Sequence, residues 1–248
     1  MRREAPDVIV IGGDIAAPGP MPRETLERVM ALGESARCIR GNTDRELVEH
    51  CDGTSALPKD DVWARRGAWA AERIGAAQRD FLAALTATVA FDVEGLGPTL
   101  FCHGSPRSDE EIVTRATPAE RLDAALAGVA ERVVVCGHTH VQFDRTHRGT
   151  RVVNAGSVGM HWEGRPGAYW LLLGPTVEPR CTTYDVEAAA RRIRATGYPE
   201  PDELVARLTA HDPSLAAEAT ARFERVASDA ARRRSSPGAV TTRLGGPR

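Results

Sequence analysis

The chain has 248 residues, of which 42% are hydrophobic and 27% are charged, and its net charge is −2. This length allows one sizeable α/β domain with an appendage, and the composition is ordinary for a globular protein. The near-neutral charge argues against a nucleic-acid-binding surface, and no apolar run has the length of a membrane span or signal peptide, so we expect a cytoplasmic protein without membrane partners.

The first part of the chain alternates between predicted strands and helices. Short apolar runs that end at glycine predict buried strands, and apolar residues at helical spacing predict helices. Strands are predicted at 7–14, before Gly41, at 89–93 and at 99–103, and helices at 24–32 and over much of 45–90. This order favours an α/β fold.

The second part begins with a helix and continues with several strands. The helix is predicted over 118–130, with Thr117 as its N-cap and Pro118 at its first position. The strands that follow are predicted at 132–136, 141–146, 151–154, 168–173 and 180–184.

The chain divides into three predicted parts. Residues 1–185 form the main domain, and residues 186–230 form a helical appendage with helices at 186–196 and 200–229. Residues 231–248 are rich in Arg, Ser, Pro and Gly, a composition that predicts a disordered tail.

Residues of the types that bind metal ions follow four of the predicted strands. They are Asp14, Asn42, His103, His138 and His140. Ligands in α/β sheets bind beyond the carboxyl ends of the strands, so these side chains are expected to converge. Taken singly, each has a simpler interpretation, such as a turn residue or a buried core histidine. Their common position at strand ends is what predicts a metal site.

The pair His138 and His140 is the strongest single signal in this set. Residues two apart in a strand point to the same side, so both imidazoles face one cleft if the strand geometry persists. The alternative is two histidines of a turn that are hydrogen-bonded to carbonyl groups.

The order and spacing of these motifs resemble those of the calcineurin-like metallophosphoesterase superfamily. The motifs are Gly-Asp, Gly-Asn-x-Asp, His-Gly, Gly-His-Thr-His and a small-residue loop at 154–159, and the resemblance covers about residues 7–184. It is greatest to the small bacterial phosphodiesterases. The resemblance implies an αββα sandwich of two mixed β-sheets flanked by helices. It also implies two divalent transition metal ions, of Mn, Fe, Ni or Zn.

The resemblance also assigns roles by motif. Asp14 would bridge the two metals, Asn42, His103 and His138 would complete one of them, and His140 would bind the other. The implied activity is hydrolysis of a phosphoric ester, preferably a phosphodiester, by a metal-bound hydroxide, because two metals can ionise a water and clamp the oxygens of the displacement. The alternative is a non-catalytic protein of this fold that binds or regulates and has an incomplete metal site.

The family's opening Asp-x-His, which supplies two ligands to the first metal, is absent from this sequence. Only Asp14 and His140 remain for that metal, which would impair activity. Our hypothesis is that the start codon was assigned too late or that the chain is truncated. An in-frame Asp-x-His in the upstream DNA would support it.

Three further residues are candidates for contact with the substrate. Thr43 stands where many members of the family carry a histidine, so Asp44 becomes the nearest candidate for orientation or proton transfer. Arg107 could bind the substrate phosphate through its bidentate guanidinium, although a solvated surface arginine is the alternative. Asn154 begins the small-residue loop, which could approach a phosphate, support the histidine loop, or be a tight turn between strands.

The substrate stays open at this stage. Nucleotides, cyclic nucleotides, phosphoproteins and lipid phosphates all fit, since specificity in such folds depends on loops and appended segments. A nucleic acid is expected only as a substrate, and a homo-oligomer is compatible with the sequence.

Overall fold

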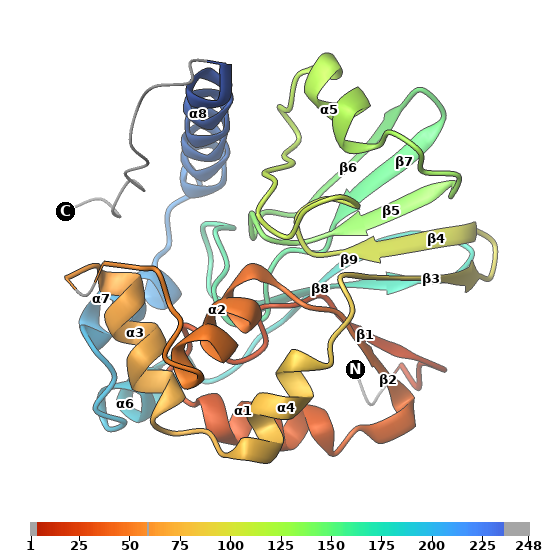
Figure 1. The fold of residues 1–248 in the computed structure, drawn as a ribbon. Coiled ribbons are helices and arrows are strands. Elements are labelled where there is room, and N and C mark those ends of the chain that lie inside the picture. Colours follow the sequence, from red (N-terminus) through yellow and green to blue (C-terminus); the bar gives the residue numbers. More distant parts are fainter. Residues whose placement is uncertain (1–3, 59, 236–248) are drawn as a thin grey trace.

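The computed structural model describes residues 4–58 and 60–235 of the chain. Its centre is a five-stranded mixed sheet in the order β3-β4-β5-β7-β6 (Figure 1). The strands are β3 (Thr88–Val93), β4 (Gly97–Cys102), β5 (Val133–Cys136), β6 (Phe143–His147) and β7 (Thr150–Asn154). The central strands β4, β5 and β7 are parallel, whereas β3 and β6 pair antiparallel at the two edges.

The central strand β5 is buried on both faces, which explains why its sequence is an unbroken apolar run. Val134 and Cys136 pack toward helix α5 (Ala119–Ala125) on one face of the sheet. Val133 and Val135 belong to the core on the opposite face. Successive residues of a strand point to opposite sides, so β5 contributes to both cores.

The second layer of strands covers that opposite face. It consists of the parallel pair β1 (Ile9–Ile11) and β2 (Ala36–Cys38) and the antiparallel pair β8 (Ala168–Leu173) and β9 (Val177–Thr182). Apolar residues of β1, β8 and β9 pack with Phe101 of β4 in the core between the layers. The two pairs are not joined into one mixed sheet, because no strand of the described residues pairs with both.

Four helices form a layer beside the first strand pair (Figure 1). They are α1 (Pro22–Met30), α2 (Asn42–Cys51), α3 (Val62–Ala71) and α4 (Ala76–Ala83), with a short 3-10 turn at Gly33–Ser35 after α1. Leu26, Leu47, Ala70 and Leu82, one from each helix, are buried in a common core. With α5 on the far side, the expected αββα sandwich is confirmed.

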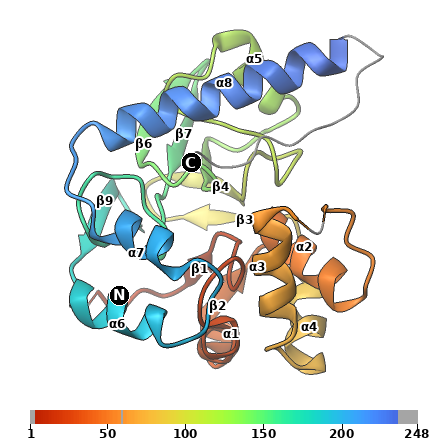
Figure 2. The ribbon, with the colours of Figure 1, turned by 90° about the vertical axis from the view of Figure 1, so that its left-hand side faces the viewer.

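The C-terminal appendage contains three helices rather than the two that the sequence predicts. They are α6 (Val186–Arg194), α7 (Pro201–Thr209) and α8 (Leu215–Ser235). The predicted helix over 200–229 is interrupted after Thr209, because Pro213 disfavours helical geometry at the residue before it and removes a backbone donor. Helix α8 lies over the side of the sandwich that holds α5 and β6 (Figure 2).

Two predicted boundaries differ from the structure. Helix α8 continues to Ser235, so the first residues of the predicted tail 231–248 are helical, and 236–248 lie outside the described residues. Helix α5 ends at Ala125 rather than near 130, and Pro118 instead of Thr117 is its N-cap. The Thr117 hydroxyl is used elsewhere, since it donates to Glu224 of α8 at 2.8 Å.

The appendage is packed onto the main domain. Ile193, Leu204 and Leu208 of α6 and α7 are buried in a core that also contacts Trp69 of α3 and Met160 of the loop after β7. Within the described segments, no helix has both the length and the apolar character needed to cross a bilayer.

Candidate metal centre

The five predicted ligands all lie beyond the carboxyl ends of strands. Asp14 follows β1, Asn42 is the first residue of α2 after β2, and His103 follows β4 directly. His138 and His140 follow β5. One ligand atom from each of Asp14, His103 and His138 lies within 4.8 Å of the others. The fold thus brings together three side chains that are up to 124 positions apart in the sequence, from Asp14 to His138.

The imidazole of His103 is held in one orientation and one tautomer. Its Nδ1 lies 2.8 Å from the carbonyl oxygen of Gly12, and because a carbonyl can only accept, Nδ1 is the donor. Its Nε2 then lies 3.2 Å from Oδ2 of Asp14 and 3.2 Å from Nδ1 of His138. A histidine that donates one ring N–H to a carbonyl and presents the other nitrogen to a carboxylate has the usual arrangement of a metal ligand.

The charges of the three groups favour a cation between them. Burial lowers the pKa of His103, but the charge of Asp14 and its hydrogen bond outweigh burial and raise that pKa to about 9. Burial raises the pKa of Asp14, but the charge and hydrogen bond of His103 hold it below its ordinary value. Burial and the charge of His103 lower the pKa of His138 to about 4. A metal ion between the three groups would offset the charge of Asp14 and satisfy the imidazole nitrogens that face it.

Two more predicted ligands carry buried polar atoms without partners. Oδ1 of Asn42 and Nδ1 of His140 are buried and have no hydrogen-bond partner in the described part of the chain. The amide nitrogen of Asn42 makes only a long contact, of 3.5 Å, to Oε1 of Glu46. An unpaired buried polar atom costs about 1–3 kcal/mol, so both atoms fit a coordinating role. Oxygen and imidazole donors of this kind suit divalent transition metals.

The histidine loop does not have the strand geometry on which its prediction rested. Strand β5 ends at Cys136, and His138 and His140 have left-handed backbones with φ of 62° and 58°. The backbone N–H of Thr139 donates to the Gly137 carbonyl at 2.6 Å, so the chain turns sharply at His138. Left-handed backbone at a residue other than glycine costs of order 1–3 kcal/mol and is concentrated at functional sites.

Asn154 supports this loop through hydrogen bonds. Its side chain is fully buried, and its amide nitrogen donates to the Gly137 carbonyl at 2.6 Å and to the Thr139 hydroxyl at 3.1 Å. Its amide oxygen accepts from the backbone N–H of Gly156 at 2.9 Å. Because both ends of the amide are engaged, these hydrogen bonds favour the predicted support of the histidine loop, and contact of Asn154 with a substrate stays a prediction.

Asp44 likewise has a positioning role and does not face an open site. Its fully buried carboxylate accepts backbone N–H groups from Asp14 and Ile15, each at 2.8 Å, and from Gly41 at 2.9 Å. Burial raises the pKa of Asp44, and the nearby charge of Asp14 raises it further. These hydrogen bonds favour the predicted role in orientation, and proton transfer by Asp44 stays a prediction.

The side chain of Arg107 forms an ion pair with Glu111. Its guanidinium contacts the carboxylate of Glu111 through Nε at 2.8 Å and through Nη2 at 2.5 Å, and Ser105 donates to the same carboxylate at 2.6 Å. Because Glu111 occupies the bidentate face of the guanidinium, the structure gives no support to phosphate binding by Arg107.

Glycines at the centre have a role that the sequence analysis missed. A Cβ atom on Gly41 would lie within 3.0 Å of the backbone nitrogen and Oδ1 of Asp14. A Cβ on Gly13 would lie as close to Gly41 and to Nδ1 of His103. These glycines allow the ends of β1 and β2 to approach closely. The signal for Gly41 was present in the Gly-Asn motif, where the glycine served only to mark the end of a predicted strand.

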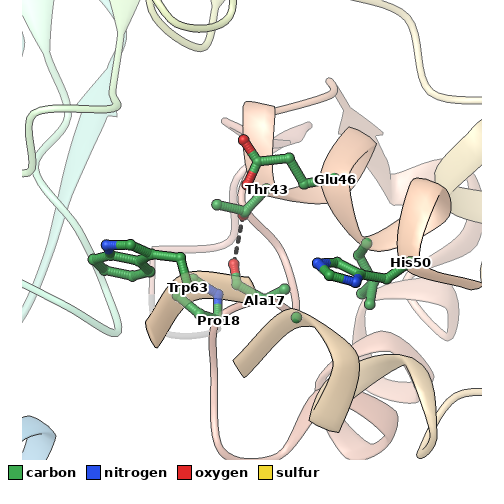
Figure 3. Close-up of a pocket in the computed structure, with 8 residues that line it drawn as sticks. Ala17, Pro18, Thr43, Glu46, His50 and Trp63 are labelled. Atoms are coloured by element: carbon green, nitrogen blue, oxygen red, sulfur yellow. Dashed lines mark hydrogen bonds between the residues drawn. The ribbon is translucent and has the colours of Figure 1, made fainter. Parts of the chain in front are cut away.

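A small pocket flanks the centre between α2, α3 and the loop after β1 (Figure 3). It is lined by Ala17, Pro18, Thr43, Glu46, Leu47, His50, Trp63 and Gly67. Thr43 joins pocket and centre, because its backbone N–H donates to Oδ1 of Asp14 at 3.0 Å. Its hydroxyl donates to the Ala17 carbonyl, so it is not free to replace the histidine found here in many family members.

Comparison with known proteins gives one family match. The family model described as the calcineurin-like phosphoesterase superfamily domain matches residues 1–173. Symmetrical bis(5′-nucleosyl)-tetraphosphatases of Colwellia psychrerythraea and Aeromonas salmonicida are 42% identical over 55 residues and 40% identical over 57 residues. These matches cover 22% and 23% of this chain but only 19% and 21% of the relatives, so the chain spans about a fifth of their length.

Two solved structures resemble most of the molecule. A metallophosphoesterase of Sphaerobacter thermophilus has a TM-score of 0.65 and 25% identity, over 83% of this chain and 88% of that one. A hypothetical protein of Pyrococcus horikoshii has a TM-score of 0.70 and 21% identity, over 83% and 85% of the two chains. These likenesses support the αββα architecture.

Proposed function

This chain belongs to the calcineurin-like phosphoesterase superfamily, and from that membership we propose that it hydrolyses a phosphoric ester, preferably a phosphodiester, with bound divalent metal ions. The observation that carries the proposal is the convergence of Asp14, His103 and His138 on one point. The tautomer of His103 is fixed there by the Gly12 carbonyl.

We further propose that the centre is dinuclear. Asp14, Asn42, His103 and His138 would hold one metal ion, and Asp14 and His140 would contribute to a second. Bound ions of the Mn, Fe, Ni or Zn type would supply Lewis acidity toward the phosphate and make a water nucleophilic near neutral pH. The remaining groups fix these ligands: the Gly12 carbonyl orients His103, Asp44 holds the backbone of Asp14, and Asn154 holds the histidine loop.

A dinucleoside polyphosphate is the second substrate to test. Its basis is the name of the two partial relatives, which are tetraphosphatases that act on bis(5′-nucleosyl) compounds. The alternative to catalysis is a binding or regulatory protein of the same fold. It is favoured by the small ligand set proposed for the metal ion at Asp14 and His140, which is the one to which the family's Asp-x-His would contribute.

The experiment combines metal analysis with hydrolysis. The full chain is loaded with Mn, Ni or Zn, its metal content is measured by elemental analysis, and hydrolysis of bis(p-nitrophenyl) phosphate and p-nitrophenyl phosphate is followed. We expect hydrolysis of the diester, and loss of both metal and activity in His138→Ala. His147→Ala is the matched control. His147 belongs to β6, away from the centre, and its Nε2 is hydrogen-bonded to Oδ1 of Asp123 at 2.6 Å.

The outcomes separate the proposals. Bound metal without hydrolysis of any ester, including the dinucleoside tetraphosphate, supports the binding protein. No bound metal at all overturns the metal centre and the hydrolase together. A limit of one ion per chain at saturating Mn overturns the dinuclear centre alone.

A further inference from the structure

The guanidinium of Arg207 lies beside the histidine loop, although it comes from α7, outside the residues that match the family. Its Cζ lies 4.2 Å from the ring centroid of Trp162. The backbone N–H of Trp162 donates to the carbonyl of His140 at 3.2 Å. The next residue of α7, Leu208, is buried in the core that contacts Met160. The turn of α7 that carries Arg207 is therefore fixed against the loop after β7, which is hydrogen-bonded to the histidine loop at His140.

Arg207 is one of the charged groups that act electrostatically on His140, together with Asp14 and His103. Its contact with Trp162, whose backbone N–H donates to the His140 carbonyl, places the guanidinium on the His140 side of the centre. A cation in this position attracts an anion bound at the same centre.

Arg207 has an unusually weak counter-ion for a buried cation. Its side chain is 13% exposed, and among the described residues its ion pair is with Glu203, at 3.4 Å. The same carboxylate is held more closely, at 2.6 Å, by Arg66, which is only 3% exposed. A buried charge is unfavourable unless it is well paired, so this guanidinium would be stabilised by an additional anion.

The surrounding cluster also carries an excess of positive charge. Glu200 pairs with Arg65 at 2.5 Å and with Arg66 at 3.5 Å. Three guanidiniums, those of Arg65, Arg66 and Arg207, thus share the two carboxylates of Glu200 and Glu203. Of the three, Arg207 has the longest contact to a carboxylate and is the one beside the histidine loop.

We propose that Arg207 binds a non-bridging oxygen of the substrate's phosphate on the His140 side of the metal centre. The inference rests on the proposed hydrolase function for its substrate, but the anion site itself does not require catalysis. Guanidinium groups match phosphate oxygens in geometry and charge, which makes phosphate the anion that this site fits. The C-terminal appendage would then complete the binding site, and not only pack against the domain.

The test uses inorganic phosphate as the probe and the full, Mn-loaded chain as the protein. Phosphate binding is measured by titration calorimetry, and KM and kcat are measured with bis(p-nitrophenyl) phosphate. In Arg207→Met we expect about tenfold weaker phosphate binding and about tenfold higher KM, the loss typical of one charge-assisted hydrogen bond. Metal content should stay at the wild-type level, because Arg207 is not a ligand.

Arg194→Met is the matched control. It removes a guanidinium from the same appendage and breaks the ion pair of Arg194 with Asp202, but this pair is exposed. Its phosphate affinity and KM should equal those of the wild type. Arg207→Lys is the second variant, which keeps the charge and much of the stem, and should bind phosphate with intermediate affinity.

The outcomes decide between this inference and the hydrolase proposal. Phosphate affinity within twofold of the wild type in Arg207→Met, or no phosphate binding by the metal-loaded wild type, overturns the role of Arg207. If Arg207→Met does not fold, Arg207→Lys provides the test. It loses the two parallel donors of the guanidinium, so a phosphate affinity equal to that of the wild type would overturn the role of Arg207. The protein could also bind phosphate through Arg207 and yet hydrolyse no ester. That result would support the role of Arg207 and refute the proposed hydrolase function.

Discussion

The buried carboxylate of Asp44 accepts a hydrogen bond from the backbone N–H of Asp14 at 2.8 Å. It accepts a second from Ile15 and a third from Gly41, so one side chain fastens the end of β1 to the start of α2. This contact positions Asp14, whose own carboxylate faces His103 at 3.2 Å. The geometry of the metal centre therefore depends on a residue that does not belong to the ligand set.

Asp44→Asn should weaken both the fold and metal binding. The amide that replaces the carboxylate has one accepting oxygen and a donor NH2 group, so at least one of the backbone N–H groups of Asp14, Ile15 and Gly41 loses its acceptor. We expect a loss of about 1–3 kcal/mol in the free energy of unfolding and about 10–100-fold in metal affinity. Urea denaturation and titration with Mn measure the two effects.

The control for this variant is Asp52→Asn. Asp52 is paired with Arg79 at 2.5 Å on the surface of the helical layer, where solvent screens the pair, so its loss should leave unfolding and metal affinity close to those of the wild type. If Asp44→Asn keeps its stability and metal content but changes the pH profile of hydrolysis, Asp44 transfers a proton after all and its positioning role is wrong.

Gly41→Ala should displace Asp14. The added Cβ would lie within 3.0 Å of the backbone nitrogen and Oδ1 of Asp14, and neither atom can move without breaking the centre. Overpacking of this kind costs about 1–3 kcal/mol of unfolding free energy. Gly174→Ala is the matched control, because its Cβ would have no neighbour within 4 Å. Equal thermal stability and metal content in the two variants would contradict the close approach that we describe.

The sequence predicts the positions of the ligands because strand ends are local features. Apolar runs that stop at glycine predict β4 and β5 within two residues, and parallel strands bring the residues after them to one edge of the sheet. The αββα architecture was predicted through resemblance to a family, and the structure and the family match confirm it. Convergence of Asp14, His103 and His138 follows from that topology.

What the sequence does not predict depends on contacts between distant segments. The left-handed backbone of His138 and His140 cannot be inferred from strand alternation, because a bond from Asn154 holds the loop in place. The approach of Arg207 to Trp162, 45 positions apart in the sequence, is likewise decided by tertiary packing. Propensity and motif spacing contain no information about such partners.

Asn154→Ala should make the histidine loop less ordered, although it changes none of the predicted metal ligands. It removes the hydrogen-bond donor to the Thr139 hydroxyl, which is buried, and to the Gly137 carbonyl, which is partly buried. We expect a loss of about 1–3 kcal/mol in unfolding free energy. Hydrolysis should fall in proportion to metal content and recover at high Mn concentration, because the effect on activity acts through His138. A rise in KM at full metal occupancy would instead indicate that Asn154 contacts the substrate.

Arg107→Ala should leave phosphate binding unchanged and alter only the acid side of the stability profile. Arg107 is 54% exposed and its fork is occupied by Glu111, so we expect phosphate affinity within about twofold of the wild type and a loss below about 1 kcal/mol at neutral pH. Burial raises the pKa of Glu111, but the hydrogen bonds of Arg107 and Ser105 and the charge of Arg107 hold it below its ordinary value of 4.5.

A carboxylate with a lowered pKa stabilises the fold above its unfolded pKa, and this contribution is lost as the pH falls through the folded pKa. Without Arg107 the folded pKa of Glu111 rises, so Arg107→Ala should begin to lose stability at a higher pH than the wild type. Urea denaturation at a series of pH values between 7 and about 4 measures this shift. If the stability profiles of the two proteins coincide, the ion pair does not contribute to stability. A tenfold loss of phosphate affinity in Arg107→Ala would instead show that Arg107 binds the substrate phosphate.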